Sequence, residues 1–207
     1  MKFTGGEPFL NPHLLKVLDH IPDSQKSKCI LHFSTNLTKI NEAILNLLDK
    51  FKETWISVSV EGIGDVLEYA RFPHKWSNLE NNLKLVIGRH KVFVTVSHVI
   101  QSPTFVGIKK LINYFDNIET KIEPLLLESP TCFQLSSIKT NIKQKFISDM
   151  QRYNGYNLSF VRTVLNFVKN NIEYDKNSAI ECVERLKMLD RVRKTNFDRV
   201  SAIDLFL

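Results

Sequence analysis

The sequence predicts an α/β fold: parallel strands in a partial, barrel-like open sheet, followed by an α-helical C-terminal extension. Two observations predict it. Short β-branched runs alternate with amphipathic helical stretches over the first 130 residues, a rhythm typical of βα units with a parallel sheet. After Ser129-Pro130 this alternation stops, and only helical periodicity remains.

The first predicted helix begins at Asn11-Pro12, because an Asn cap followed by proline is a favoured helix start. A further helix has an apolar stripe from Ile40 to Phe51, and a third is expected over 77–88 with Ser77 as its cap. The strands are predicted at 29–35, 55–61, 92–100 and 120–128, with another helix at 104–116. Three more helices are expected near 137–152, 158–172 and 177–193. We therefore expect a barrel-like domain over 1–130 and a mainly helical extension over 131–207.

Three of the predicted strands carry one polar phase, although strands of a parallel sheet usually read as continuous apolar runs. Side chains alternate between the two faces of a strand, so this phase lies on one face. Its members are His32, Ser34 and Asn36, then Ser57, Ser59 and Glu61, then Thr95 and Ser97. A barrel-like sheet around a polar ligand would explain it. An open sheet with one solvated face would explain it equally simply.

The segment Thr4-Gly5-Gly6-Glu7-Pro8 is the most informative motif. Two glycines leave the backbone bare for close approach to a ligand, and Pro8 restricts Glu7 to an extended conformation. A bare backbone beside one fixed carboxylate suits a ligand ammonium group. Taken by itself, the same pattern also fits a simple turn.

This segment resembles the GGEP motif of radical S-adenosylmethionine (SAM) enzymes, and further likenesses follow in the same order. Ser34-Thr35-Asn36 is similar to the family's third-strand end, with Leu37 in place of glycine. The segment 57–62 resembles its fourth strand, with Glu61 for the usual aspartate. Residues 68–73 and Trp76 resemble the "EYIRYP…W" motif of the phage-type twitch-domain group, and 189–193 its "LDxxR" ending.

The resemblance implies a TIM-like barrel, truncated at its N-terminus, that binds SAM. Gly5, Gly6, Glu7 and Pro8 would contact the methionine amino group, and Arg71 would pair with the carboxylate. The remainder of the cofactor would be held by four residues: Asn36, Ser59, Glu61 and Ser97. In the family, a [4Fe-4S] cluster cleaves SAM reductively to a 5′-deoxyadenosyl radical.

The cluster ligands of that family, a CxxxCxxC loop, do not occur in this sequence. Cys29, Cys132 and Cys182 are far apart, whereas cluster cysteines are closely grouped. The six histidines show no metal-ligand spacing either, so no metal ligand is predicted. Because the GGEP motif starts at residue 5, we expect the cluster segment to be missing, or supplied by a split partner chain, and the chain alone to be inactive.

Composition bounds the remaining possibilities. The 207 residues include 43% hydrophobic and 24% charged residues, with no signal-peptide pattern and no run long enough to span a bilayer. Three scattered cysteines suggest free thiols and a reducing cytoplasm. Residues 131–207 hold 13 Lys and Arg against 8 Asp and Glu, so the basic excess lies in the tail.

Two functions are therefore weighed from the sequence. The first is a radical SAM enzyme fragment with an unidentified substrate. The second is a non-catalytic binding protein whose basic helical tail contacts nucleic acid or a protein partner. A set of solvated helix faces would give the same tail charge.

Overall fold

The computed structural model describes residues 1–200 and 203–207, and its chain divides into two compact units. The first unit comprises Met1–Val60 and His74–Ser97, and the second comprises Glu61–Pro73 and His98–Leu207. The predicted boundary near residue 130 stays a prediction.

The first unit holds four strands and four α-helices. Its strands are β1 (Lys2–Phe3), β2 (Ile30–Thr35), β3 (Glu53–Ser59) and most of β4 (Val92–Ile100). Its helices are α1 (Pro12–His20), α2 (Asp23–Lys26), α3 (Glu42–Leu48) and α5 (Trp76–Val86), with a short 3-10 helix at Pro8–Leu10. The predicted strand–helix alternation is confirmed.

Strands β1 to β4 pair in parallel, in the order in which they occur along the chain. The register places Phe3 beside Phe33, Phe33 beside Ile56, and Ile56 beside Val94. In the sheet order β1-β2-β3-β4-β5, β1 and β5 occupy the two ends. The described strands therefore form an open parallel sheet, and its closure into a TIM-like barrel stays a prediction.

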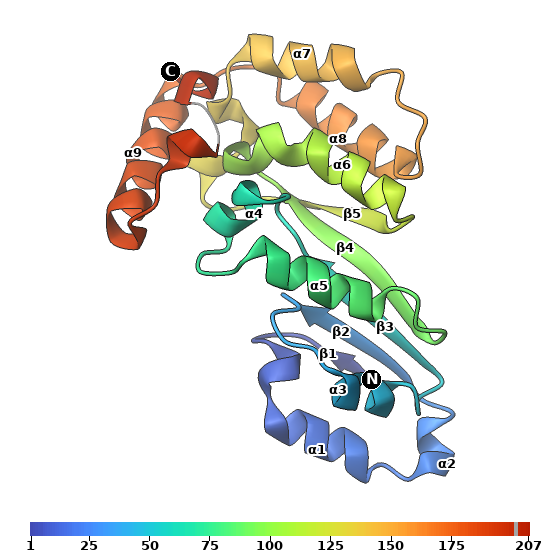
Figure 1. Cartoon of the computed structure of the whole chain (residues 1–207). Coiled ribbons are helices and arrows are strands. Elements are labelled where there is room, and N and C mark those ends of the chain that lie inside the picture. Colours follow the sequence, from blue (N-terminus) through green and yellow to red (C-terminus); the bar gives the residue numbers. More distant parts are fainter. Residues whose placement is uncertain (201–202) are drawn as a thin grey trace. The chain divides into compact units, whose positions relative to one another are not determined.

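Helices α1, α3 and α5 lie on one side of the strands of the first unit (Figure 1). Leu31, Phe33, Ile56 and Val58 point to this side and are at most 2% exposed. The other phase is polar or exposed, as predicted. Its members are exposed His32, Trp55 and Phe93 and half-buried Ser34, Ser57, Ser59, Thr95 and Ser97.

The second unit contains β5 (Lys121–Leu126) and the helices α4 (Asp65–Ala70), α6 (Ile108–Asn117), α7 (Thr140–Met150), α8 (Leu158–Asn170) and α9 (Lys176–Arg193). Short 3-10 helices occur at Ser102–Gly107, Thr131–Phe133, Leu135–Ser137, Phe197–Arg199 and Ile203–Leu205. The three helices predicted after residue 130 are confirmed as α7, α8 and α9. None of the helices in the described part of the chain has the length and apolar character needed to cross a bilayer.

Local signals account for the helix boundaries, and two expectations are corrected. The Asn11 side chain accepts hydrogen bonds from the N–H groups of His13 and Leu14, so the predicted cap of α1 is confirmed. Ser77 is not the cap of α5, because the extended backbone of a cap residue falls two positions earlier, at Lys75.

The α-helix expected over 104–116 begins later than predicted. The chain forms a 3-10 helix at Ser102–Gly107, and the α-helix begins only at Ile108. Pro103 lies in the first turn of the 3-10 helix, where its missing N–H costs nothing. The apolar periodicity of the region does not distinguish the two helix types.

A buried amide joins three elements of the second unit. The Asn157 side chain accepts a hydrogen bond from the N–H of Ile122 (2.7 Å) and donates to the Asp116 carboxylate (2.8 Å) and the Thr120 carbonyl (3.1 Å). Asn157 is 3% exposed, so water cannot replace these partners. The amide therefore ties the end of α6 and the start of β5 to the start of α8.

We expect Asn157→Ala to lower the free energy of unfolding by about 2–4 kcal/mol, because it leaves buried donors and acceptors without partners. Urea denaturation followed by circular dichroism measures the change. Asn177→Ala, at an exposed position in α9, is the matched control and should change stability by less than about 0.5 kcal/mol. Equal stability losses for the two variants would contradict the assigned role of Asn157.

Candidate functional site

The carboxyl ends of β1 to β4 lie at one edge of the parallel sheet, and in folds built from successive βα units this edge carries the ligand sites. The loop of residues 4–8, here called the glycine loop, follows β1 at this edge. Gly5 and Gly6 adopt φ values of +90° and +60°, which residues with a Cβ atom rarely adopt. A Cβ at either position would meet nothing within 4 Å, so the backbone conformation and not crowding requires glycine. The loop therefore exposes bare peptide groups.

Two uncharged donors hold the Glu7 carboxylate in place. The Thr35 hydroxyl donates to Oε1, and the Asn36 backbone N–H donates to Oε2 at 2.7 Å. Glu7 itself is extended (φ −121°, ψ 104°), which confirms the effect predicted for Pro8. The glycine loop is thereby fixed to the end of β2 through an anionic group that receives one hydrogen bond on each oxygen.

Leu37 occupies the position at which the motif of the resembling family has glycine. Its φ is +51°, so the chain keeps the left-handed conformation there without glycine. Such a conformation costs a residue with a Cβ atom about 1–2 kcal/mol. The Leu37 side chain is fully buried, and its N–H donates to the Thr35 hydroxyl at 2.8 Å. Burial of the side chain offsets the backbone cost, and the same hydroxyl that anchors Glu7 also holds this turn.

Hydroxyl groups continue the site along the polar face of the sheet. The Ser57 and Ser97 hydroxyls are 2.6 Å apart and form a hydrogen bond between β3 and β4. Ser59 pairs in register with Ser97 at the end of β3 and is half-buried. Ser59 thus ends β3, Ser97 lies within β4, and both belong to the same unit as Glu7.

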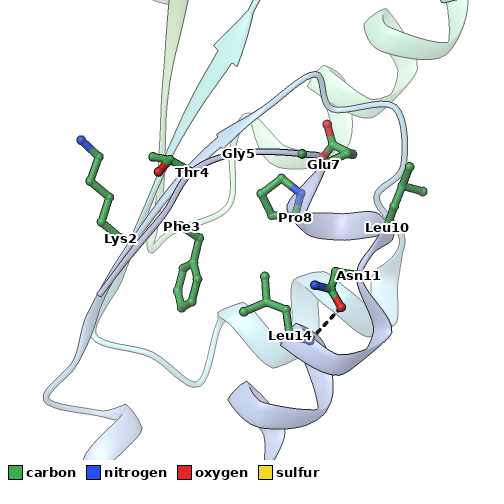
Figure 2. A pocket seen from close by; sticks show the side chains of 10 residues that line it. Lys2, Phe3, Thr4, Gly5, Glu7, Pro8, Leu10, Asn11 and Leu14 are labelled. Carbon is green, nitrogen blue, oxygen red and sulfur yellow. Dashed lines mark hydrogen bonds between the residues drawn. The ribbon is translucent and has the colours of Figure 1, made fainter.

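A cavity of about 500 Å³ lies beside the glycine loop, between β1 and α1. Its lining combines polar groups with the apolar side chains of Phe3, Pro8 and Leu14. Figure 2 shows Phe3 and Leu14 on one side of the loop and the Glu7 carboxylate directed to the opposite side. The Glu7 carboxylate therefore does not face the apolar part of this lining.

Glu61 and Arg71 belong to the second unit and form an ion pair there. The Arg71 Nε and Nη2 groups donate to the two carboxylate oxygens of Glu61, a bidentate arrangement suited to guanidinium. Glu61 is 5% exposed and lies beyond the end of β3, so the strand predicted to 61 ends earlier, at Ser59. The structure therefore brings these two predicted residues together.

Gly62 allows α4 to lie close to Glu61. A Cβ on Gly62 would come within 2.3 Å of the Val66 Cγ1 atom, so only glycine permits this approach. Arg71 is the C-cap residue of α4, and its N–H donates to the Leu67 carbonyl at 2.8 Å. The short helix α4 was not predicted from the sequence, yet it sets the position of Arg71 relative to Glu61.

The predicted site residues fall into two groups. Gly5, Gly6, Glu7, Pro8, Asn36, Ser59 and Ser97 lie in the first unit, and Glu61 and Arg71 lie in the second. Sequence reasoning missed Thr35, because it assigned ligand contacts to the phase of Ser34 and Asn36. Thr35 is 3% exposed and belongs to the opposite phase. The sequence signal that could have identified Thr35 is a hydroxyl side chain at the end of a strand face that is otherwise apolar, after Leu31 and Phe33.

The residues of this chain do not fit a four-iron cluster. Cys29 is half-buried, Cys132 and Cys182 are buried, and all three are free thiols. Burial raises the pKa of Cys182 to about 12, which opposes the thiolate form that metal ligation needs. Over residues 1–200 and 203–207, no cluster of three His, Cys, Asp or Glu side chains is placed to hold a metal ion.

Several cations of the basic tail have partners within the second unit. Lys143 is fully buried and donates to the carbonyls of Leu135, Asn171 and Glu173. Other tail cations form ion pairs: Lys145 with Asp149, and Arg185 with Glu181. These contacts stabilise the tail and do not by themselves indicate a polyanion site.

No protein-family model matches the chain, and comparisons with curated proteins and with solved structures gave no match.

We expect Thr35→Val to lower the free energy of unfolding of the chain by about 1–3 kcal/mol. The isosteric change removes the donor to Glu7 and the acceptor for the Leu37 N–H while the site stays buried. Thr163→Val, an exposed change of the same kind in α8, is the control. Chemical denaturation measures both, and a Thr35→Val loss no greater than that of the control would contradict the anchoring role.

Proposed function

We propose that this chain is the SAM-binding part of a radical SAM enzyme. The observation that carries the proposal is the Glu7 carboxylate, fixed by Thr35 and Asn36 directly after two glycines at the carboxyl edge of a parallel sheet. A carboxylate that receives one hydrogen bond per oxygen still has lone pairs for an ammonium group. The ordered motifs of the sequence support the same assignment.

In this proposal, each predicted residue has a distinct binding role. Glu7 binds the SAM ammonium, with peptide groups of Gly5 and Gly6 beside it. Within the second unit, Arg71 has a fork of five N–H donors suited to binding a carboxylate group, and it shares its guanidinium with Glu61. Asn36, Ser59 and Ser97 hold the remainder of the molecule. Bound SAM supplies a positively charged sulfonium whose S–C bond can be cleaved by one-electron reduction.

The chain itself does not supply the electron for this cleavage. Because the three cysteines do not fit a cluster, another segment or a partner chain would have to supply it. The outer edge of β1 is a suitable place for such a segment, since a strand at a sheet edge presents unpaired backbone groups. We place the protein in a reducing compartment, in keeping with its three free thiols.

Calorimetric titration of the chain with SAM tests the binding proposal. We expect saturable one-to-one binding that weakens roughly 10-fold or more in Glu7→Gln, because the charge-assisted contact to the ammonium is lost. Glu42→Gln is the control, since this carboxylate is exposed and pairs with Arg89. Absence of binding by the unmodified chain, or equal affinity for both variants, would overturn the proposal.

Anaerobic incubation with iron and sulfide tests whether the cluster ligands lie outside this chain. We expect the chain alone to bind no four-iron cluster, because its cysteines are separated and two of them are buried. Visible absorbance and iron content measure the outcome. A stoichiometric cluster on the isolated chain would show that the assignment of ligands to another segment is wrong.

A further inference from the structure

The C-terminal end of α9 contacts the segment that carries Arg71, entirely within the second unit. The Arg193 Nη1 group donates to the backbone carbonyl of Tyr69 at 3.1 Å. The same guanidinium lies 5.9 Å from the centre of the Phe72 ring, within the range of a cation–π contact. One side chain of α9 therefore contacts the residues at positions −2 and +1 from Arg71.

Tyr69 supplies a second connection between α4 and α9. Its ring is 6% exposed and packs against Phe197 at 5.2 Å, and its hydroxyl donates to the Leu186 carbonyl at 3.4 Å. Burial and the nearby Asp190 carboxylate raise the pKa of Tyr69, so its hydroxyl stays protonated at neutral pH. The end of α4 is thus anchored by a buried side chain as well as by its backbone.

The end of α9 is itself well ordered by hydrogen bonds. The Asp190 carboxylate accepts from the Thr195 hydroxyl at 2.8 Å and from the Phe197 N–H at 3.0 Å. Lys194 ends the helix in the left-handed conformation, with its N–H bonded to the Asp190 carbonyl. Arg193 is therefore presented from a fixed turn, and its contacts can hold the Arg71 segment in one arrangement.

We propose that Arg193 is a positioning residue for Arg71. By holding the Tyr69 carbonyl and the Phe72 ring, it keeps the intervening Arg71 guanidinium against Glu61 and aimed at the carboxylate of an amino-acid ligand. This inference rests on the proposed function, in which Arg71 binds the SAM carboxylate. It assigns a positioning role to a helix end more than 120 residues away in sequence.

The test compares two ligands that differ in the group that Arg71 would bind. SAM carries the amino-acid carboxylate, whereas 5′-methylthioadenosine lacks it. We expect Arg193→Ala to weaken SAM affinity roughly 10-fold with little change for 5′-methylthioadenosine, because only a carboxylate contact is lost. Arg193→Lys should recover part of the affinity, because an ammonium can still donate to the Tyr69 carbonyl. Equal weakening for both ligands would indicate a general structural role and overturn the inference.

Arg191→Ala is the matched control, since Arg191 is exposed on the same helix and its loss changes the charge equally. It should leave both affinities unchanged. If the unmodified chain does not bind SAM, the proposed function fails, and a ligand-independent measurement then decides the positioning role.

That measurement is the Arg71 Nε–H signal in a nitrogen-15 NMR spectrum of the chain. The group donates to the buried Glu61 carboxylate, so we expect slow exchange with water in the unmodified chain and in Arg191→Ala. Exchange should become fast in Arg193→Ala while the backbone amides of α6 and α8 keep their protection. An unchanged Arg71 signal in Arg193→Ala would overturn the positioning role, whatever the chain binds.

Discussion

Parallel pairing of β1 to β4 is the constraint on which the candidate site of the first unit depends. Because the strands run in the same direction, the glycine loop, Asn36 and Ser59 follow or end strands at one edge of the sheet, and Ser97 lies beside Ser59 within β4. Helices cover one face, so the side chains that face them are apolar, and the polar phase remains on the other face. The position of each polar group thus follows from strand direction and from which face is covered.

The glycine loop shows how this edge is stabilised without a cation. The Glu7 carboxylate is bound by a hydroxyl and a peptide N–H, and the Thr35 hydroxyl also accepts from the Leu37 N–H. Two backbone segments, the glycine loop and residues 35–37, therefore meet at two side chains. Any ligand ammonium at Glu7 would join an existing network, which lowers the ordering cost of binding.

In the second unit, helix α9 holds the segment around Arg71 in place. Tyr69, Phe72 and the Tyr69 carbonyl are all held by groups on or just after α9, and Arg71 lies between them. Asp190 and Arg193 at this helix end thus have a structural explanation that does not need a polyanion. Regions that the sequence separates by more than a hundred residues become a single packed element.

The sequence by itself determined most of the elements, because strand alternation, helix periodicity and the Asn11 cap are local signals that neighbouring residues set. It did not predict α4 or the 3-10 helix at Ser102–Gly107. It also identified candidate ligand-binding residues, Glu7 and Arg71 among them. Only the tertiary structure decided their partners: Thr35 for Glu7, Glu61 for Arg71, and Arg193 for the segment around Arg71. Each of these pairs joins separate segments, and no local pattern specifies which buried donor will satisfy a given carboxylate or carbonyl. That choice depends on strand register and helix packing, which exist only in the folded chain.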